Sequence, residues 1–395
     1  MSLPRIAIVD QAAKRLRHYD AWVFQDELVE PQPSIAPGEP VEIVTAGGRF
    51  VAHGFYNPRS HIALRALSLA QDQPITPVLL AGRIAEAIAR RHSIRNTNAR
   101  RLVFSEADAL PGLIVDQYDR VLVVQFRTAG MDRFRAAALD ALRALAPTGI
   151  LDRSDKEFRE EEGLPPVTQV LDGSVPDRIA IEEEGLRFLV DPYRGLKTGF
   201  FLDQRDARRR LRELVTPGQR LLDVFSYTGG FGIAAAAGGA QVVCVEQDEA
   251  FLSLAKENAR LNQVEHRIQF VAGNAFYWLD AKANAREQLD WVMLDPPGLA
   301  KTRGDIRSGR QALHHLLVRA MAMLPAGGKL AVSLCTYHLL GLAEEIIRIA
   351  AAEHGMRVRV REQWLQAQDH PWVLQIPATR YLTTWLLETD ARSAG

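Results

Sequence analysis

The stretch that decides the fold reads Leu221-Leu222-Asp223-Val224-Phe225-Ser226-Tyr227-Thr228-Gly229-Gly230-Phe231-Gly232. Its first five residues form an apolar run typical of a buried strand, and the glycines indicate a strand-to-helix turn. An alanine-rich segment follows and ends at Gly238-Gly239, and a second apolar run, 241–246, ends in Glu246. Strand, glycine turn, helix and strand in this order predict a βαβ unit of an α/β protein.

The same alternation continues through the C-terminal part, residues 191–395. Further strands are predicted at 268–272, 291–295 and 329–335, with helices such as 250–261 and 311–324 between strands. The runs 357–364 and 381–387 have no helix between them, which predicts an antiparallel pair at one edge of the sheet. The pattern as a whole predicts a mostly parallel sheet with helices on both faces.

The 395 residues exceed one hydrophobic core, so two or three domains are expected. Residues 1–74 contain short apolar runs separated by turn residues, which predicts a small β-barrel. Residues 75–190 contain a helical pattern at 78–91, strands at 113–115 and 121–124, a helix at 134–145 and a loop-rich stretch at 163–177. They form a middle segment in which helices and strands are mixed.

The composition excludes several classes of protein. No apolar run reaches the roughly 18 residues of a transmembrane helix, and the first residues do not resemble a signal peptide. Two cysteines, Cys244 and Cys335, cannot form a disulfide framework, so we expect a cytoplasmic protein. The formal net charge is zero, yet five arginines and no acid occupy residues 90–101. That run indicates either an RNA-docking surface or a solvated helix face.

The glycine turn and the acid that ends the second strand indicate a nucleoside-containing cofactor. In open α/β sheets ligands bind at the carboxyl ends of the strands, where an acid can hold ribose hydroxyls. Glu246 occupies that position. The loop does not have the Gly-x-Gly-x-x-Gly spacing, which argues against a dinucleotide and favours S-adenosylmethionine. The sequence indicates no metal site.

Two further residues are expected at the same rim of the sheet. Asp295-Pro296-Pro297 ends the fourth strand, so its carboxylate can face a base placed beside the cofactor. Cys335 ends the next strand in polar company, whereas Cys244 lies within an apolar run and is interpreted as a buried hydrophobe.

These motifs are similar to those of a known family, the bacterial 23S rRNA cytosine-C5 methyltransferases that carry an N-terminal PUA domain. The similarity runs from about residue 5 to residue 388 and includes segments outside the cofactor loop. They are Trp22-Val23-Phe24, Gly54-Phe55-Tyr56-Asn57-Pro58, Leu110-Pro111-Gly112-Leu113-Ile114-Val115-Asp116 and Lys197-Thr198-Gly199-Phe200-Phe201-Leu202-Asp203-Gln204-Arg205.

The resemblance implies a PUA barrel over 1–74, a central α+β domain over 75–190 and a class I, Rossmann-like methyltransferase domain with a seven-stranded sheet over 191–395. It implies S-adenosylmethionine as cofactor and 23S rRNA, or a large-subunit assembly intermediate, as partner. The expected cofactor-binding residues are Gln204, Arg205, Phe225, Ser226, Tyr227, Thr228, Gly229, Glu246, Asn274 and Asp295. Two positions depart from the family pattern, because Asn274 replaces an acid and Gly298-Leu299-Ala300-Lys301 replaces a Lys-Phe start.

The resemblance also implies a covalent mechanism, since carbon 5 of cytosine is a poor nucleophile. We expect the Cys335 thiolate to add to carbon 6 and Asp295 to act as the acid during addition. Asp369 and His370 are candidates for the base that removes the carbon-5 proton, but a structural turn explains them equally well. Phe201, Tyr227 and Tyr337 are candidates for stacking on an extruded base.

Three other functions remain open from sequence. Methylation of a ring or exocyclic nitrogen needs no cysteine, so Cys335 argues against it. A non-catalytic PUA-type assembly factor needs neither the glycine loop nor Asp295, and a dehydrogenase is a more distant alternative. The sequence leaves the oligomeric state open, with a homodimer as one option.

Overall fold

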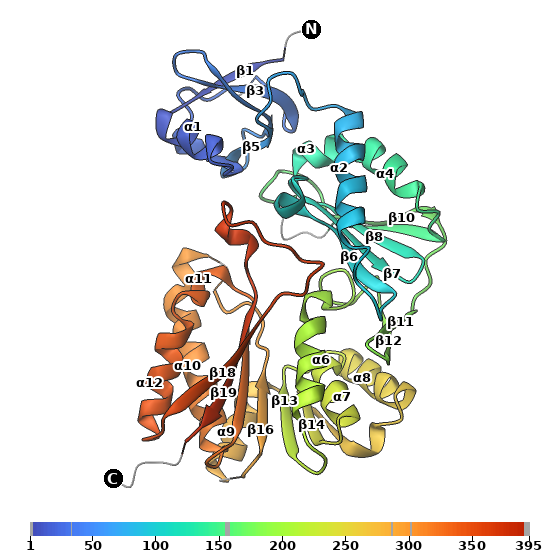
Figure 1. Cartoon of the computed structure of the whole chain (residues 1–395), viewed down its shortest axis with the longest axis vertical. Helices are drawn as coiled ribbons and strands as arrows, with labels where there is room; N and C mark the ends of the chain where they lie inside the picture. Colours follow the sequence, from blue (N-terminus) through green and yellow to red (C-terminus); the bar gives the residue numbers. More distant parts are fainter. Residues whose placement is uncertain (1–2, 33, 155–158, 286, 301, 391–395) are drawn as a thin grey trace. The chain divides into compact units, whose positions relative to one another are not determined.

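A computed structural model describes residues 3–32, 34–154, 159–285, 287–300 and 302–390 (Figure 1). The chain forms two compact units. The first consists of Met1–Ile181, Val190–Leu202 and Gln368–Thr379, and the second of Glu182–Leu189, Asp203–Ala367 and Arg380–Gly395. No helix in the described ranges combines the length and the apolar character needed to cross a bilayer.

The first sheet of the first unit is a small barrel, as predicted. Its strands lie in the order β1 (Arg5–Ile8), β3 (Glu39–Thr45), β4 (Phe50–Tyr56), β5 (Ile62–Ser68) and β2 (Trp22–Phe24), with helix α1 (Asp10–Arg17) between β1 and β2 in sequence. The two ends of the sheet are joined by backbone hydrogen bonds of 3.0 Å from Val9 to Glu27 and from Val29 to Ala7. These bonds close the sheet and leave few unpaired strand edges.

The central sheet of the same unit packs against three helices. Its strands are β10 (Val167–Gly173), β9 (Gly149–Ser154), β8 (Val121–Phe126), β7 (Leu113–Tyr118) and β6 (Ala99–Phe104), and only the β8–β9 pair is parallel. The helices are α2 (Pro77–Arg90), α3 (Ala129–Arg133) and α4 (Arg135–Arg143). Leu80 and Ile84 from α2 and Leu139 and Leu142 from α4 enter the same apolar core.

The prediction of a loop-rich stretch at 163–177 is wrong, because β10 lies within it. β10 is an edge strand that pairs only with β9 among the described strands, and most of its side chains are exposed or half-buried. An edge strand of this kind lacks the alternation of apolar and polar residues on which recognition from sequence depends. A two-stranded hairpin, β11 (Ile179–Glu183) with β12 (Leu186–Val190), follows it along the chain.

The second unit contains the seven-stranded sheet that the sequence predicts. The strand order is β15 (Ile268–Ala272), β14 (Gln241–Glu246), β13 (Arg220–Val224), β16 (Trp291–Leu294), β17 (Lys329–Leu334), β19 (Thr383–Thr389) and β18 (Val358–Leu365). The first five strands are parallel, and β19 is antiparallel to both neighbours, which confirms the predicted edge pair. The order reverses at β13, so the carboxyl edge beside β13 is the expected ligand site.

Helices cover both faces of this sheet (Figure 1). One set comprises α6 (Arg205–Leu214), α7 (Gly230–Ala237) and α8 (Glu249–Leu261). The other comprises α9 (Ala275–Asn284), α10 (Ile306–Ala322) and α12 (Ala343–Glu353), with the short helix α11 (Tyr337–Leu340) before α12. Buried residues of α9, α10 and α12 form one apolar core with the strands, including Leu279, Leu317 and Ile347. Burial on both faces explains why the parallel strands are continuous apolar runs in the sequence.

The basic run at 90–101 is not a single solvated surface. The Arg91 guanidinium is buried and donates two hydrogen bonds of 2.7 Å to Asp108, and Arg101 is held in the same way by Asp116. Arg95 is exposed and Arg100 is half-buried. These buried bidentate pairs hold the C-terminal end of α2 and join β6 to β7, so Arg91 and Arg101 are structural residues.

Helix α7 packs so closely on the sheet that Gly232 has no room for a side chain. A Cβ atom there would lie 2.4 Å from Cys244 Sγ and 3.1 Å from an oxygen of Asp223. Gly82 in α2 is also helical, but a Cβ atom added to it would meet nothing within 4 Å. Packing therefore requires a glycine at position 232, whereas nothing in the structure requires one at position 82. The two positions form a matched pair for substitution.

We expect Gly232→Ala to lower the free energy of unfolding by about 1–3 kcal/mol, because α7 must shift away from β13 and β14. Gly82→Ala should raise it by about 1 kcal/mol, because alanine is the better helix former at an open site. Urea titration followed by circular dichroism measures both values. A neutral Gly232→Ala variant would show that α7 is not held at this distance.

Candidate functional site

The loop between β13 and α7 has an unusual backbone. Phe225 and Tyr227 have positive φ angles of 66° and 50°, and Gly229 follows with 82°. The amides of Phe225 and Ser226 both donate to the Val245 carbonyl at 3.1 Å, which ties the loop to the neighbouring strand β14. Non-glycine residues with left-handed backbone are costly and gather at ligand-binding sites, where the surroundings hold them in place.

Glu246 fixes this loop from the end of β14. Its carboxylate accepts a hydrogen bond from the Tyr227 amide at 2.9 Å, and its second oxygen accepts from the amides of Gln247 and Asp248 at 2.9 and 3.0 Å. The side chain is half-buried, so part of it remains accessible. The sequence places an acid at this position, and the structure shows that it also determines the loop conformation.

Asp223 lies within β13 beneath the loop and was not among the expected site residues. One oxygen accepts from the Gly232 amide at 2.8 Å, and the other has no hydrogen-bond partner in the described structure. Burial raises the pKa of Asp223 to about 7, with help from the negative charges of Asp295 and Glu246 and against the opposing effect of the Gly232 amide. The signal in the sequence was an acid inside an otherwise apolar strand.

Asp295 follows β16 and is held by a buried glutamine. Gln204 Nε2 donates to Asp295 Oδ1 at 3.2 Å and to Ser333 Oγ at 2.7 Å, and Ser333 bonds in turn with Thr384 at 2.8 Å. Gln204 and Ser333 are buried. This chain of hydrogen bonds joins the ends of β16, β17 and β19 and fixes the orientation of the carboxylate. Ser333 was missed as a site residue, because a serine within a strand carries no distinctive sequence signal.

The two cysteines lie in different environments. Cys335 follows β17 at the carboxyl edge, is half-buried, and its Sγ lies 4.0 Å from the Pro296 carbonyl oxygen. Cys244 lies inside β14, and burial raises the pKa of its thiol well above the usual value, with the nearby Asp223 acting in the same direction. Cys244 therefore stays protonated, and only Cys335 is placed where a substrate can reach it.

Two other expected cofactor residues, Asn274 and Arg205, have defined positions in the structure. Asn274 follows β15 and caps α9, since its Oδ1 accepts from the amides of Phe276 and Tyr277 at 3.0 and 3.4 Å. Its carbonyl oxygen is thus engaged, and the amide nitrogen is the group that can still donate. Arg205 begins α6 and is buried. The loop, Glu246, Asn274, Asp295 and Cys335 all follow parallel strands, so they share one edge of the sheet.

Asp369 and His370, the candidates for the base, belong to the first unit. Asp369 is fully buried and accepts a 2.9 Å hydrogen bond from the Arg101 amide, while its other oxygen lies 3.0 Å from His370 Nδ1. These contacts give both residues a structural role. Of the aromatic candidates, Tyr227 is buried against Phe251 with ring centroids 4.6 Å apart, whereas Tyr337 is half exposed.

Comparison with protein families supports the two predicted functional domains. Residues 165–360 match the profile of the S-adenosylmethionine-dependent methyltransferases, and residues 6–69 match that of the PUA-like domain. Both the cofactor and the nature of the N-terminal barrel are therefore confirmed.

Relatives of known name cover almost the whole chain. Ribosomal RNA large subunit methyltransferase I of Serratia proteamaculans is 33% identical over 389 residues, which is 96% of this chain and 97% of that protein. The enzyme of the same name from Salmonella arizonae is 33% identical over 390 residues, with 96% of each chain covered.

Solved structures show the same fold at lower identity. The crystal structure of SMU.776, a methyltransferase complexed with SAH, has a TM-score of 0.85 at 18% identity and covers 98% of this chain and 100% of its own. A SAM-dependent methyltransferase from Streptococcus mutans has a TM-score of 0.84, also at 18% identity, with the same coverage.

The residues at the carboxyl edge fit S-adenosylmethionine. Buried polar atoms without a hydrogen-bond partner gather there, namely Thr228 Oγ1, Gln204 Oε1 and Asp223 Oδ1. Buried polar atoms are normally paired, so these positions indicate a polar ligand. The acids Asp223, Glu246 and Asp295 give the edge a negative charge, which suits the cationic sulfonium of this cofactor.

The raised pKa of Asp223 leads to a pH-dependent affinity. A cation nearby favours the ionised carboxylate, so binding of S-adenosylmethionine lowers the pKa of Asp223 from about 7. Binding at low pH must therefore expel a proton, and affinity should rise from about pH 6 to about pH 8. S-adenosylhomocysteine, whose sulfur is neutral, should show a flatter profile in calorimetric titrations. Asp223→Asn should abolish the difference between the pH profiles of the two ligands. Equal profiles for both ligands in the wild-type protein would contradict this expectation.

The position of Glu246 gives a second expectation for cofactor binding. Glu246→Ala removes both a charged acceptor and the support of the Tyr227 amide, so affinity for S-adenosylhomocysteine should fall by roughly 1.5–3 kcal/mol. Glu246→Gln keeps the shape of the side chain, so its loss of affinity should be smaller. Glu249→Ala, at an exposed acid that begins α8, is the matched control and should bind normally. Unchanged affinity in Glu246→Ala would remove this residue from the cofactor site.

Proposed function

The chain belongs to the ribosomal RNA large subunit methyltransferase I family, and on this premise we propose that it methylates carbon 5 of a cytosine in 23S rRNA. The proposed nucleophile is Cys335, the proposed acid is Asp295, and the cofactor is S-adenosylmethionine. The cofactor is proposed to contact Gln204, Arg205, the loop residues Phe225, Ser226, Tyr227, Thr228 and Gly229, and Glu246, Asn274 and Asp295. We also propose that the PUA domain spans residues 1–74, the central α+β domain 75–190 and the methyltransferase domain 191–395.

The observation that carries the proposal is a half-buried thiol that lies next to Pro296, the residue after a carboxylate held by Gln204. Cys335 and Asp295 follow the neighbouring parallel strands β17 and β16, in which Val332 is paired with Leu294. Cys335 Sγ lies 4.0 Å from the carbonyl oxygen of Pro296, the residue that follows Asp295. Transfer of a methyl group to nitrogen would need no thiol, because nitrogen already carries a lone pair.

The proposed reaction has three steps: addition to carbon 6, methylation of carbon 5, and elimination of the cysteine. The Cys335 thiolate adds to carbon 6 as Asp295 delivers a proton to ring nitrogen 3, so carbon 5 gains enamine character. When bound, S-adenosylmethionine supplies an electrophilic methyl group and leaves as the neutral thioether. Carbon 5 takes the methyl group, a base removes the carbon-5 proton, and the bond between sulfur and carbon 6 breaks while nitrogen 3 returns its proton. The Gln204 amide keeps the Asp295 carboxyl oriented throughout.

The RNA partner is proposed to be 23S rRNA or an assembly intermediate of the large subunit. The names of the relatives and the PUA-like domain support this choice. We further propose that the enzyme acts in the cytoplasm, where two free cysteines stay reduced.

Replacement of Cys335 tests the mechanism. Cys335→Ala should fold and bind S-adenosylmethionine as the wild type does, yet form no 5-methylcytosine, because carbon 5 is no longer activated. Mass spectrometry of nucleosides from 23S rRNA incubated with each protein measures the product. Cys244→Ala is the matched control and should stay active, since its buried thiol takes no part in the steps above.

A fluorinated substrate provides an independent readout. RNA with 5-fluorocytosine at the target should form a covalent adduct with the wild type, because fluorine blocks the final proton removal. The Cys335→Ala variant should form none. Substantial 5-methylcytosine from Cys335→Ala would falsify the proposal, and a methylated nitrogen as the mapped product would favour the rival reaction.

A further inference from the structure

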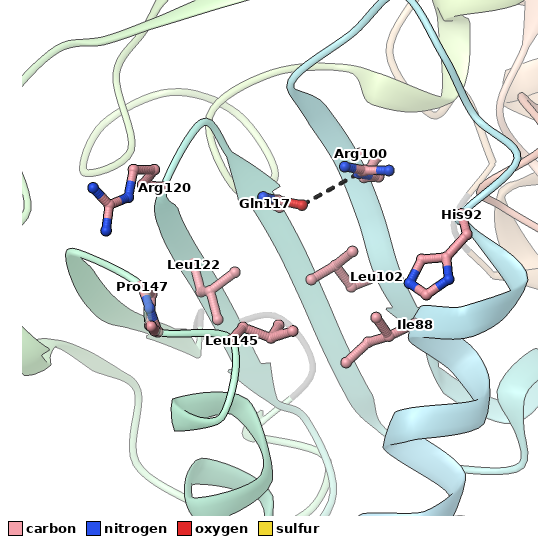
Figure 2. Close-up of a pocket in the computed structure, with 10 residues that line it drawn as sticks. Ile88, His92, Arg100, Leu102, Gln117, Arg120, Leu122, Leu145 and Pro147 are labelled. Atoms are coloured by element: carbon pink, nitrogen blue, oxygen red, sulfur yellow. Dashed lines mark hydrogen bonds between the residues drawn. The ribbon is translucent and has the colours of Figure 1, made fainter.

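One pocket is lined by residues of the central sheet, of α2 and of the segment after α4. It has a volume of about 210 Å³. Figure 2 shows its apolar floor, to which Ile88 comes from α2, Leu102 and Leu122 from β6 and β8, and Leu145 from the segment after α4. Leu145 is exposed to 43% although it is a large apolar residue. All of these residues belong to the first unit.

The rim of the pocket is basic. Arg100 and His92 lie on one side and Arg120 on the other (Figure 2). None of the lining residues within the described ranges is acidic. Asp119, the acid nearest to Arg120 in sequence, accepts a 3.3 Å hydrogen bond from Asn98. A cationic rim around an apolar floor indicates an anionic ligand with a flat apolar body.

The Arg100 side chain is held in a defined orientation. Its Nε donates to Gln117 Oε1 at 3.2 Å and its Nη1 to the Arg91 carbonyl at 3.3 Å. Gln117 Nε2 is itself anchored on the Asp119 carbonyl at 2.8 Å. An arginine fixed in this way presents a preorganised guanidinium, which suits a phosphate or the face of a base.

We propose that this pocket binds one unpaired nucleotide of the RNA substrate, with its base on the apolar floor and its flanking phosphates on the two basic sides. The volume is smaller than the roughly 300–1,000 Å³ of sites for drug-sized ligands and suits a single base. Each base within an RNA chain has a phosphate on either side, whereas a free nucleoside monophosphate has one. Cations on opposite sides of the floor therefore favour an RNA chain. The inference rests on the proposed action on rRNA and adds a docking point for it.

Two exposed residues allow a test that leaves the fold intact. Arg120→Gln should weaken binding to single-stranded 23S rRNA fragments and reduce the slope of log Kd against log salt by about one phosphate contact. Leu145→Ser should weaken binding by about fivefold without changing the slope, because it removes apolar contact and no charge. Arg143→Gln is the matched control on α4 outside the pocket, and it should bind RNA as the wild type does. Fluorescence anisotropy with labelled fragments, in the absence of cofactor, measures all four proteins.

Crosslinking identifies the contact itself. Fragments that contain 4-thiouridine should crosslink to the pocket, and mass spectrometry should find the adducts on residues 145–147 or His92. Wild-type affinity and salt slope in both pocket variants, or crosslinks only elsewhere, would overturn the inference. Because the binding assay involves no methyl transfer, its result is independent of which atom of the base is methylated.

Discussion

The hydrogen bond between the Glu246 carboxylate and the Tyr227 amide is the constraint on which the cofactor edge depends. The loop that begins at Phe225 contains two non-glycine residues with left-handed backbone. Such a conformation costs of order 1–3 kcal/mol for each residue and needs support from its surroundings. That support comes from the neighbouring strand β14, through Glu246 and through the Val245 carbonyl. The same carboxylate that stabilises the loop is thereby set at the edge where the ribose is proposed to bind.

The proposed catalytic pair, Asp295 and Cys335, lies beside a second network of hydrogen bonds, which joins β16, β17 and β19. Gln204 precedes α6, and its amide joins Asp295 with Ser333. The neighbouring Asp203 accepts hydrogen bonds from the Ala367 amide and from the Tyr381 hydroxyl. Gln204 is therefore anchored, through Asp203, to the segments that follow β18 and precede β19. Gln204, which precedes the first strand of the methyltransferase sheet in the sequence, thus positions the carboxylate of the proposed acid.

The strands of the methyltransferase sheet could be predicted from sequence because they are buried on both faces and are therefore apolar runs. The glycine turn, Glu246, Asp295 and Cys335 could be recognised because each of them ends such an apolar run. Periodicity failed for the edge strand β10, where exposed side chains removed the pattern. It also failed to show β6, because a buried arginine such as Arg101 looks like a surface residue until its partner, 15 residues away in sequence, is known. The charge state of Asp223 was equally hidden, since its raised pKa arises from burial and from acids on two other strands. Such effects depend on tertiary contacts and become visible only with coordinates.

The electrostatics of the methyltransferase edge also bear on how RNA must be held. Three acids, Asp223, Glu246 and Asp295, gather there, and their mutual repulsion is large enough to contribute to the shift of a pKa. Negative charge favours a sulfonium but repels phosphates. An RNA substrate can bring a neutral base to this edge, but its backbone requires cations elsewhere. Six arginines are buried in the described part of the chain, so their charges are not available to phosphates. We therefore propose that local basic sites, such as the rim formed by Arg100 and Arg120, bind the RNA backbone, and that these residues differ from those proposed for catalysis.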